Sequence, residues 1–252
     1  MPIDKQRLKE CYSYSADNFT SQHIFVPIGN FFAKIFIRTP ITPNQLTAGW
    51  GLLLILCSVA MAFGNYWVCI LAGIGWVIGY SLDYTDGTIA RYKNLRSKKG
   101  PFIDMVNHRI SYFLLFFCAG LGAWNFGRTE YFGLYFNPDI YLVLGGLAGI
   151  CMVLIMDFGA VFRDACGLEE IHDGDGAVNV EGRYVKNKNL FNRINDFNPL
   201  VFTNMMFLIP IFAILGLMDV FVIFYGIFYP LATIFRYFSY FRIIDDLSSK
   251  KE

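Results

Sequence analysis

The sequence WVCILAGIGWVIGYSLDYTDGTIAR, residues 67–91, joins an apolar run without charge to two aspartates and an arginine. In a helix that continues through this junction, Asp83, Asp86, Gly87 and Ala90 fall at i, i+3, i+4 and i+7 and share one face. The stretch therefore predicts a long helix that leaves a membrane and carries two carboxylates, with small residues beside them, to the membrane surface.

The composition agrees with a membrane protein. Hydrophobic residues make up 55% of the chain and charged residues only 16%, where a soluble domain carries about a quarter. We expect an all-α integral membrane protein with six transmembrane helices, because six apolar windows approach the length of about 20 residues that a bilayer requires. These windows are Leu46–Gly64, Trp67–Leu82, Ile110–Phe126, Ile140–Phe162, Leu200–Met218 and Val220–Ile244.

One domain is expected over residues 1–252, with a cytosolic and interfacial segment at 1–42 and a cytosolic polar insert at 163–198. Residues 24–38 predict an interfacial amphipathic helix, although an ordinary helix packed on the bundle explains them nearly as well. The insert contains HDGDG at 172–176 and a possible hairpin. Its glycine spacing does not fit an EF-hand, and we expect it to help select or cover a substrate.

The distribution of basic residues predicts the orientation. With the N-terminus in the cytosol, only Arg128 of the 21 lysines and arginines lies in an outward loop, which leaves 21 − 1 = 20 on the inner side. Residues 1–18 lack the apolar core of a signal peptide. The carboxylates after the second window are therefore expected to face the cytosol. The net charge of +1 and the lack of a basic strip with aromatics give no sign of nucleic-acid binding.

A third carboxylate follows on the next helix. Asp104 and His108 are four residues apart on a segment that Gly100 and Pro101 open. Three carboxylates without a cysteine or histidine cluster suit Mg²⁺ or Mn²⁺, and Arg91 offers a fork of donors for phosphate. The alternative is a set of solvated helix-end charges, but charge at a membrane boundary more often marks a functional site.

These residues resemble the signature of the CDP-alcohol phosphotransferase (CDP-alcohol phosphatidyltransferase) family, D-x2-DG-x2-AR-x8-G-x3-D-x3-D. His108 stands where the family has its final aspartate. The six-span layout is also similar, so the resemblance covers most of the chain. The matching positions are Asp83, Asp86, Gly87, Ala90, Arg91, Gly100 and Asp104.

The resemblance implies a transferase that moves a phosphoalcohol group from a CDP-alcohol to a hydroxyl acceptor and releases CMP, as members do in phospholipid biosynthesis. It implies a site for two cations, Mg²⁺ or Mn²⁺, and a homodimer. The implied metal ligands are Asp83, Asp86, Asp104 and His108, and the implied catalytic residues are His108, Asp104 and Arg91. The implied contacts to CDP and its diphosphate are Asp83, Gly87, Ala90, Arg91 and Gly100, joined by Asn44 and Thr47 from a TPN segment.

The departure at His108 leaves three interpretations. It is a variant base, an inactivating change of engineered or degenerate origin, or a structural histidine with the base elsewhere. An unperturbed imidazole is largely neutral at cytosolic pH and accepts a proton well. Asn44 and Thr47 are likewise either nucleotide contacts or helix-capping residues.

The donor also stays open. CDP-diacylglycerol with a small polar acceptor is favoured by the chain length and six spans, while a CDP-choline or CDP-ethanolamine type of transfer to a lipid uses the same motif. From other classes, a transporter would show matched helix breaks in two halves, and a silent membrane scaffold would release no CMP. The acceptor is not identified by the sequence.

Several residues inside the apolar windows have two interpretations each. Asp157 and Arg236 either pair with each other or bind the acceptor, and Arg109 is a phosphate contact or an interfacial anchor. Small residues four apart allow helices to approach closely, within the bundle or across a homodimer seam; these pairs are Gly75 with Gly79 and Gly145 with Gly149. The six cysteines form no CxxC pair and are expected to be reduced.

Overall fold

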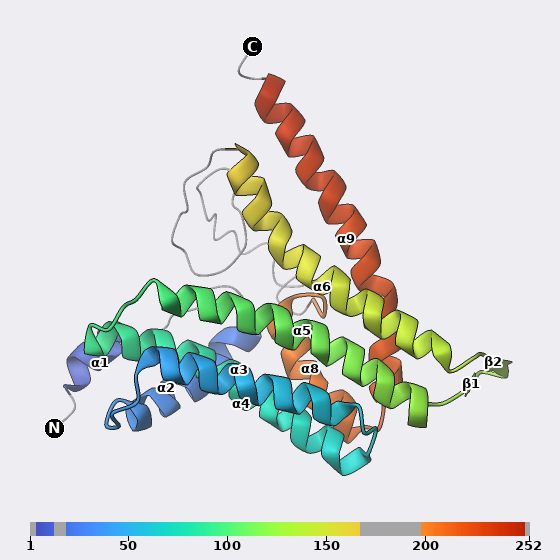
Figure 1. Ribbon diagram of the computed structural model, residues 1–252, viewed down its shortest axis with the longest axis horizontal. Coiled ribbons are helices and arrows are strands. Elements are labelled where there is room, and N and C mark those ends of the chain that lie inside the picture. The colour runs from blue at the N-terminus through green and yellow to red at the C-terminus, as the bar shows by residue number, and fades with distance from the viewer. Residues whose placement is uncertain (1–3, 13–18, 167–197, 250–252) are drawn as a thin grey trace.

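The computed structural model describes residues 4–12, 19–166 and 198–249, and within them the chain is helical apart from one small hairpin (Figure 1). The predicted hairpin and the HDGDG segment of the insert lie outside the described residues. The helices are α1 (Lys5–Cys11), the π-helical turn η1 (Ser21–Phe25), α2 (Val26–Phe36), α3 (Pro43–Met61), α4 (Tyr66–Lys93), α5 (Lys99–Phe126), α6 (Asp139–Cys166), α8 (Phe202–Ile214) and α9 (Met218–Ser249). The hairpin pairs β1 (Glu130–Tyr131) with β2 (Leu134–Tyr135) in antiparallel register.

Four described helices are long and apolar enough to cross a membrane, rather than the predicted six. These are α3, α4, α6 and, in α9, residues Met218–Asp245. The fifth window, Leu200–Met218, forms only the 13-residue helix α8, which is about 20 Å long and shorter than a hydrocarbon core of about 30 Å. The third window lies in α5, whose first eleven residues include the polar side chains of Lys99, Asp104, Asn107, His108 and Arg109. Each of the six predicted windows therefore lies largely within a described helix. Four of these helices have the length and composition of a membrane span.

The predicted continuation of the second window through the carboxylates is confirmed. Helix α4 has 28 residues without a break, about 42 Å at 1.5 Å per residue, so its last turns reach beyond the thickness of a hydrocarbon core. Asn65 caps its first turn through Oδ1, and Asn94 ends it in the left-handed conformation at φ 56°. Capping residues therefore set where α4 begins and ends, and so how far the helix continues past its apolar part with the carboxylates.

Helices α3, α4 and α5 lie side by side, while α6 and α9 pair with each other and slant away from them at their C-terminal ends (Figure 1). The core between these groups is rich in large aromatic side chains. Trp50, Trp76, Phe116 and Tyr225 are fully buried there. The antiparallel contact of α5 with α6 joins the two groups and so fixes the frame on which the site is built.

Close helix contacts within one chain account for the predicted glycine pairs. A Cβ atom on Gly145 would lie 2.6 Å from the carbonyl oxygen of Phe116, and one on Gly149 would lie 2.9 Å from that of Phe113. On α4, added Cβ atoms at Gly75 and Gly79 would meet Cys57 and Leu54 side chains of α3. These glycines therefore serve packing within the bundle, which is one of the two interpretations. They are not exposed, so they are not available for a homodimer seam.

The N-terminal helix α2 packs on α4 and also shows an apolar outer face. Gly29 accepts a hydrogen bond from Thr85 Oγ1 at 3.0 Å, and an added Cβ would clash with the backbone of Ser81. The side chains of Phe31 and Ile35 are exposed. Helix α2 therefore packs on the bundle, as one of the two interpretations holds. Its exposed apolar face also suits the other interpretation, an interfacial helix.

The crossing of α5 and α6 can be tested with two neighbouring glycines. Gly145→Ala should lower the free energy of unfolding by about 1–3 kcal/mol, because the new methyl group meets backbone atoms that cannot move aside cheaply. Gly146 has open space around its Cβ position, so Gly146→Ala should be neutral or slightly stabilising. Melting temperatures in detergent would measure both, and equal behaviour of the two variants would contradict this account of the crossing.

Candidate functional site

Three side chains from two helices meet between the C-terminal part of α4 and the N-terminal part of α5. His108 Nε2 lies 3.2 Å from Asp104 Oδ1 and 3.4 Å from Asp83 Oδ2. One ligand atom from each residue lies within 4.8 Å of the others. Asp104 and His108 are one helical turn apart on α5, and the contact with α4 adds Asp83. The structure therefore brings together three of the four predicted metal ligands.

An aromatic wall holds the imidazole of His108. Its ring centre lies 5.0 Å from that of Trp50, 5.2 Å from that of Tyr112 and 6.4 Å from that of Tyr80. Burial disfavours the charged imidazolium, but the negative charges of Asp83 and Asp104 outweigh burial and hold the pKa of His108 above its ordinary value. The ordinary pKa assumed from the sequence for an unperturbed imidazole therefore does not apply to His108.

The fourth predicted ligand, Asp86, lies apart from this group and has partners of its own. Its Oδ2 accepts a hydrogen bond from Thr47 Oγ1 at 2.6 Å and another from Trp50 Nε1 at 2.9 Å, both on α3. Thr47 Oγ1 also lies 3.0 Å from the carbonyl oxygen of Pro43. Thr47 is thus tied to a predicted metal ligand, and the cap of α3 comes instead from Thr42 with Gln45.

Arg91 is held by the N-terminal segment. Its Nε donates to the carbonyl oxygen of Cys11 at 2.9 Å, and its guanidinium lies 3.3 Å from the position that a Cβ on Gly87 would take. The small residue at position 87 therefore leaves room for Arg91 itself. Gly87 and Ala90 lie on the predicted face of α4, and both are partly buried.

Asn44 and Gly100 meet at the start of α3 and α5. Asn44 Oδ1 accepts a hydrogen bond from Ser97 Oγ at 3.1 Å, and Ser97 Oγ in turn accepts one from the backbone N–H of Gly100 at 3.2 Å. A Cβ on Gly100 would lie 3.3 Å from Asn44 Oδ1. The sequence predicted both residues near the nucleotide. The structure brings them into one small polar group where α3 and α5 begin.

The intramembrane charges pair differently from the prediction. Arg109 donates to Asp157 Oδ1 through both Nε, at 2.8 Å, and a terminal nitrogen. Arg236 donates to the carbonyl oxygen of Ile155 at 3.4 Å. The predicted pair of Asp157 with Arg236 is therefore wrong. Helix α5 places Arg109 against Asp157, and α9 places Arg236 beside the backbone of α6.

The donor atoms fit a divalent cation. Asp104 Oδ1 is buried, and its contact with His108 Nε2 at 3.2 Å is an ion pair, with no further hydrogen bond within the described residues. Two carboxylates and an imidazole are ligands that Mn²⁺ binds more readily than Mg²⁺ does. A cation held by Asp83, Asp104 and His108 would satisfy the buried oxygen, with Asp86 Oδ1 left for further coordination.

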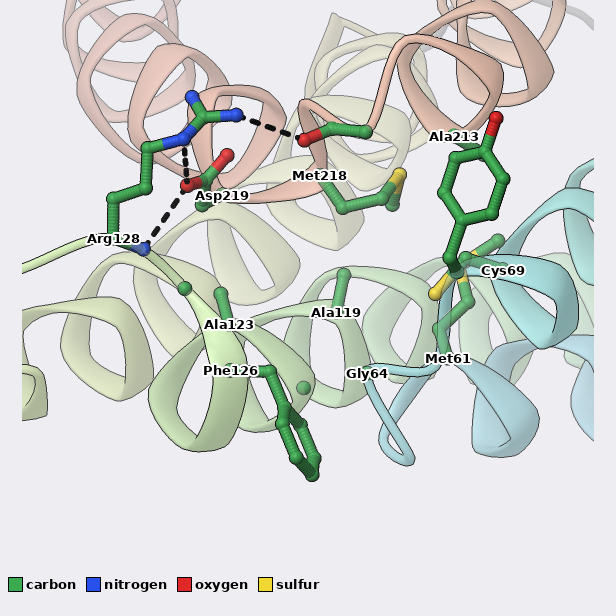
Figure 2. Close-up of a pocket in the computed structure, with 14 residues that line it drawn as sticks. Met61, Gly64, Cys69, Ala119, Ala123, Phe126, Arg128, Ala213, Met218 and Asp219 are labelled. Atoms are coloured by element: carbon green, nitrogen blue, oxygen red, sulfur yellow. Dashed lines mark hydrogen bonds and ion pairs between the residues drawn. The ribbon is translucent and has the colours of Figure 1, made fainter.

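A separate cavity of about 210 Å³ lies at the opposite end of the bundle (Figure 2). It is lined by the turns after α3, α5 and α8, where Asp219 accepts a hydrogen bond from the backbone N–H of Arg128 at 3.1 Å. Cys69 in this cavity lies fourteen positions before Asp83 on α4, which is roughly 21 Å along the helix. It is therefore not part of the carboxylate site.

Sequence reasoning missed three partners of the site. Trp50 sits in an apolar run and looks like a core residue, and only its contacts to Asp86 and His108 show otherwise. Ser97 lies in a basic loop, and the Cys11 contact to Arg91 uses a backbone carbonyl. The spacing of Thr47 and Trp50, at i and i+3 before the motif, is the one signal that could have indicated a shared face.

The fold, the carboxylate cluster and the motif agree with a known family. Residues 40–164 match the family model described as CDP-alcohol phosphatidyltransferase. These residues form a CDP-alcohol phosphatidyltransferase domain. The matched region runs from the segment before α3 to the end of α6 and includes every residue of the predicted site.

A curated relative is similar to part of this chain. The archaetidylinositol phosphate synthase of Pyrococcus horikoshii is 40% identical over 90 residues, which are 36% of this chain and 46% of the synthase. The chain thus aligns with about half the length of this CDP-alcohol phosphatidyltransferase relative. The similarity supports a common origin of the aligned segments.

The charge balance of the cluster predicts a cation-dependent stability for His108→Asp. A third carboxylate in place of the imidazole should lower the free energy of unfolding by about 2 kcal/mol without divalent cations, after allowance for solvent near Asp104. Millimolar Mg²⁺ should then raise the melting temperature of this variant more than that of the natural protein. His108→Asn has the same size without the charge, and an equal response of the two variants to Mg²⁺ would contradict the prediction.

Proposed function

We propose that this protein transfers the phosphatidyl group of a CDP-alcohol such as CDP-diacylglycerol to a hydroxyl acceptor, releases CMP and acts in phospholipid biosynthesis. The observation that carries the proposal is the group formed by Asp83, Asp104 and His108 inside the family's domain. A membrane location suits a donor with acyl chains, because α4 takes the carboxylates from an apolar span to its polar end.

Asp83, Asp86 and Asp104 would hold divalent cations, Mg²⁺ or Mn²⁺, in a two-metal arrangement beside His108, which is either a further ligand or the proton acceptor. When bound, these cations supply positive charge that draws in the diphosphate and offsets the carboxylates. Arg91, Asn44, Thr47, Gly87, Ala90 and Gly100 would line the CDP side. The planar guanidinium of Arg91, held to the Cys11 carbonyl through Nε, has the geometry to donate to phosphate oxygens.

The transfer requires one bond to form and one to break. The acceptor oxygen bonds to the phosphorus that carries the alcohol group, and the bond from that phosphorus to the bridging oxygen breaks, so that this oxygen leaves with CMP. The acceptor's proton goes to His108 Nε2, the imidazole nitrogen that faces the carboxylates. Asp104 and Asp83 would stabilise the resulting imidazolium.

A ligand role for His108 is the competing assignment, because Nε2 cannot hold a cation and accept a proton in the same step. Its other nitrogen, Nδ1, is buried and makes no hydrogen bond within the described residues. An acceptor hydroxyl could not reach Nδ1, so both roles compete for one atom. The two assignments differ in what removal of the ring does to cation affinity.

We also propose that the site faces the cytosol and that the protein is a homodimer. The orientation is supported by 20 of 21 basic residues on one side. The dimer is supported by the family resemblance alone, since the glycine pairs are used within the chain. Labelling of Ser97→Cys by a membrane-impermeant thiol reagent in right-side-out and inverted vesicles would test the orientation.

The donor is tested by following CMP release from the purified protein. CDP-diacylglycerol, CDP-choline and CDP-ethanolamine would each be supplied with Mg²⁺ or Mn²⁺ and a panel of acceptors. The name of the Pyrococcus horikoshii relative is a reason to include inositol phosphate in that panel. Release with CDP-choline and a lipid acceptor alone would support head-group transfer instead, and no release from any donor would support a silent scaffold.

His108→Ala should reduce the turnover rate by about 10²–10⁴ without weakening the affinity for Mn²⁺, as expected for removal of a proton acceptor. Asp83→Asn should weaken Mn²⁺ binding and abolish CMP release together. Steady-state rates and Mn²⁺ titrations of both variants provide the measurements. A loss of Mn²⁺ affinity in His108→Ala would favour the ligand assignment, and full turnover by that variant would exclude both roles.

A further inference from the structure

Trp50 of α3 contacts two members of the site although no part of the motif includes it. The side chain is fully buried, its Nε1 donates to Asp86 Oδ2 at 2.9 Å, and its ring centre lies 5.0 Å from that of His108. We propose that Trp50 is a positioning residue that sets the orientation of Asp86 and thereby the cation affinity of the site. This inference rests on the proposed cation site.

Helix α3 provides a neutral face for this purpose. It carries no charged side chain, and Thr47, Trp50 and Gly51 fall at i, i+3 and i+4. Thr47 Oγ1 donates to the same Asp86 oxygen as Trp50 does, at 2.6 Å. The backbone carbonyl of Thr47 accepts a hydrogen bond from Asn107 Nδ2 at 2.8 Å, so this face contacts the helix of His108 as well.

Gly51 makes the approach of α5 possible. An added Cβ would lie 2.2 Å from the amide of Asn107, too close for any side chain. Asn107 directly precedes His108, so its bond to the Thr47 carbonyl holds that turn of α5 against α3. Trp50 is therefore fixed between the carboxylate of α4 and the imidazole of α5, with little freedom to turn.

The two donors decide how Asp86 can bind a cation. Both point at Oδ2, which leaves Oδ1 as the oxygen free to coordinate. Hydrogen bonds to a charged carboxylate are strong and orient it, and partners that orient a metal ligand commonly change metal affinity by about 10–100-fold. Without the indole N–H, Asp86 would lose one of its two restraints and could turn away from the site.

The competing explanation is that Trp50 only fills the core. Trp76 is a matched control, because it is also fully buried and stacks on Tyr112 with ring centres 5.9 Å apart. Its Nε1 makes no hydrogen bond within the described residues. Replacement by phenylalanine removes a similar volume at both positions, but only Trp50→Phe removes a bond to a carboxylate of the site.

The test is the dissociation constant for Mn²⁺, measured by electron paramagnetic resonance on the purified protein without any CDP-alcohol. We expect Trp50→Phe to weaken Mn²⁺ binding by about tenfold or more and Trp76→Phe to change it by less than about twofold. Melting temperatures of both variants report packing loss separately. Equal Mn²⁺ affinities in the two variants would overturn the role of Trp50.

Asp83→Asn separates this inference from the proposed function. If Asp83→Asn binds Mn²⁺ as the natural protein does, the cation site itself is wrong. If it loses Mn²⁺ while Trp50→Phe behaves like Trp76→Phe, only the role of Trp50 is wrong.

Should Trp50→Phe fail to fold, Thr47→Val and Thr47→Ser take its place, since only the valine variant loses a donor to Asp86. Weaker Mn²⁺ binding in Thr47→Val than in Thr47→Ser would support the positioning of Asp86 by α3, and equal binding would contradict it.

Discussion

The site depends on the balance of charge between two carboxylates and one imidazole at the contact of α4 with α5. Asp83 and Asp104 come from different helices, and their negative charges would repel each other, although solvent near Asp104 weakens that repulsion. The imidazolium of His108 lies between them and offsets that repulsion without a cation. The helix contacts that hold the three groups together, above all α3 against both α4 and α5, are therefore part of the site as much as the ionisable residues are.

The sequence predicted the parts of this arrangement that are local along a helix. The spacing of Asp83, Asp86 and Gly87 placed them on one face, and the uninterrupted α4 confirms it. The separation of Asp86 from the other carboxylates could not be predicted, because it follows from donors on α3 that are 36 and 39 residues away. Trp50 was indistinguishable from a core residue for the same reason, since only a through-space contact gives its N–H a function.

The difference between six predicted spans and four has an equally physical origin. Hydropathy counts apolar residues on both sides of a helix end, while helix length is set by caps and turns. The apolar window around α8 includes residues before Phe202 and after Ile214, where Gly216 adopts φ +66° and turns the chain into α9. The partner of Asp157 was also predicted wrongly, because it is decided by how the helices pack. Asp157 pairs with Arg109 of α5 and not with Arg236, which lies deeper in an apolar stretch of the sequence.

The surroundings of His108 bear on why this chain departs from the family's final aspartate. A carboxylate at this position would be smaller than the imidazole and would face the rings of Trp50 and Tyr112 across a gap, with a third negative charge beside Asp83 and Asp104. The imidazole fills that space, and it pairs with both carboxylates through one nitrogen. Packing and electrostatics thus both favour histidine at position 108.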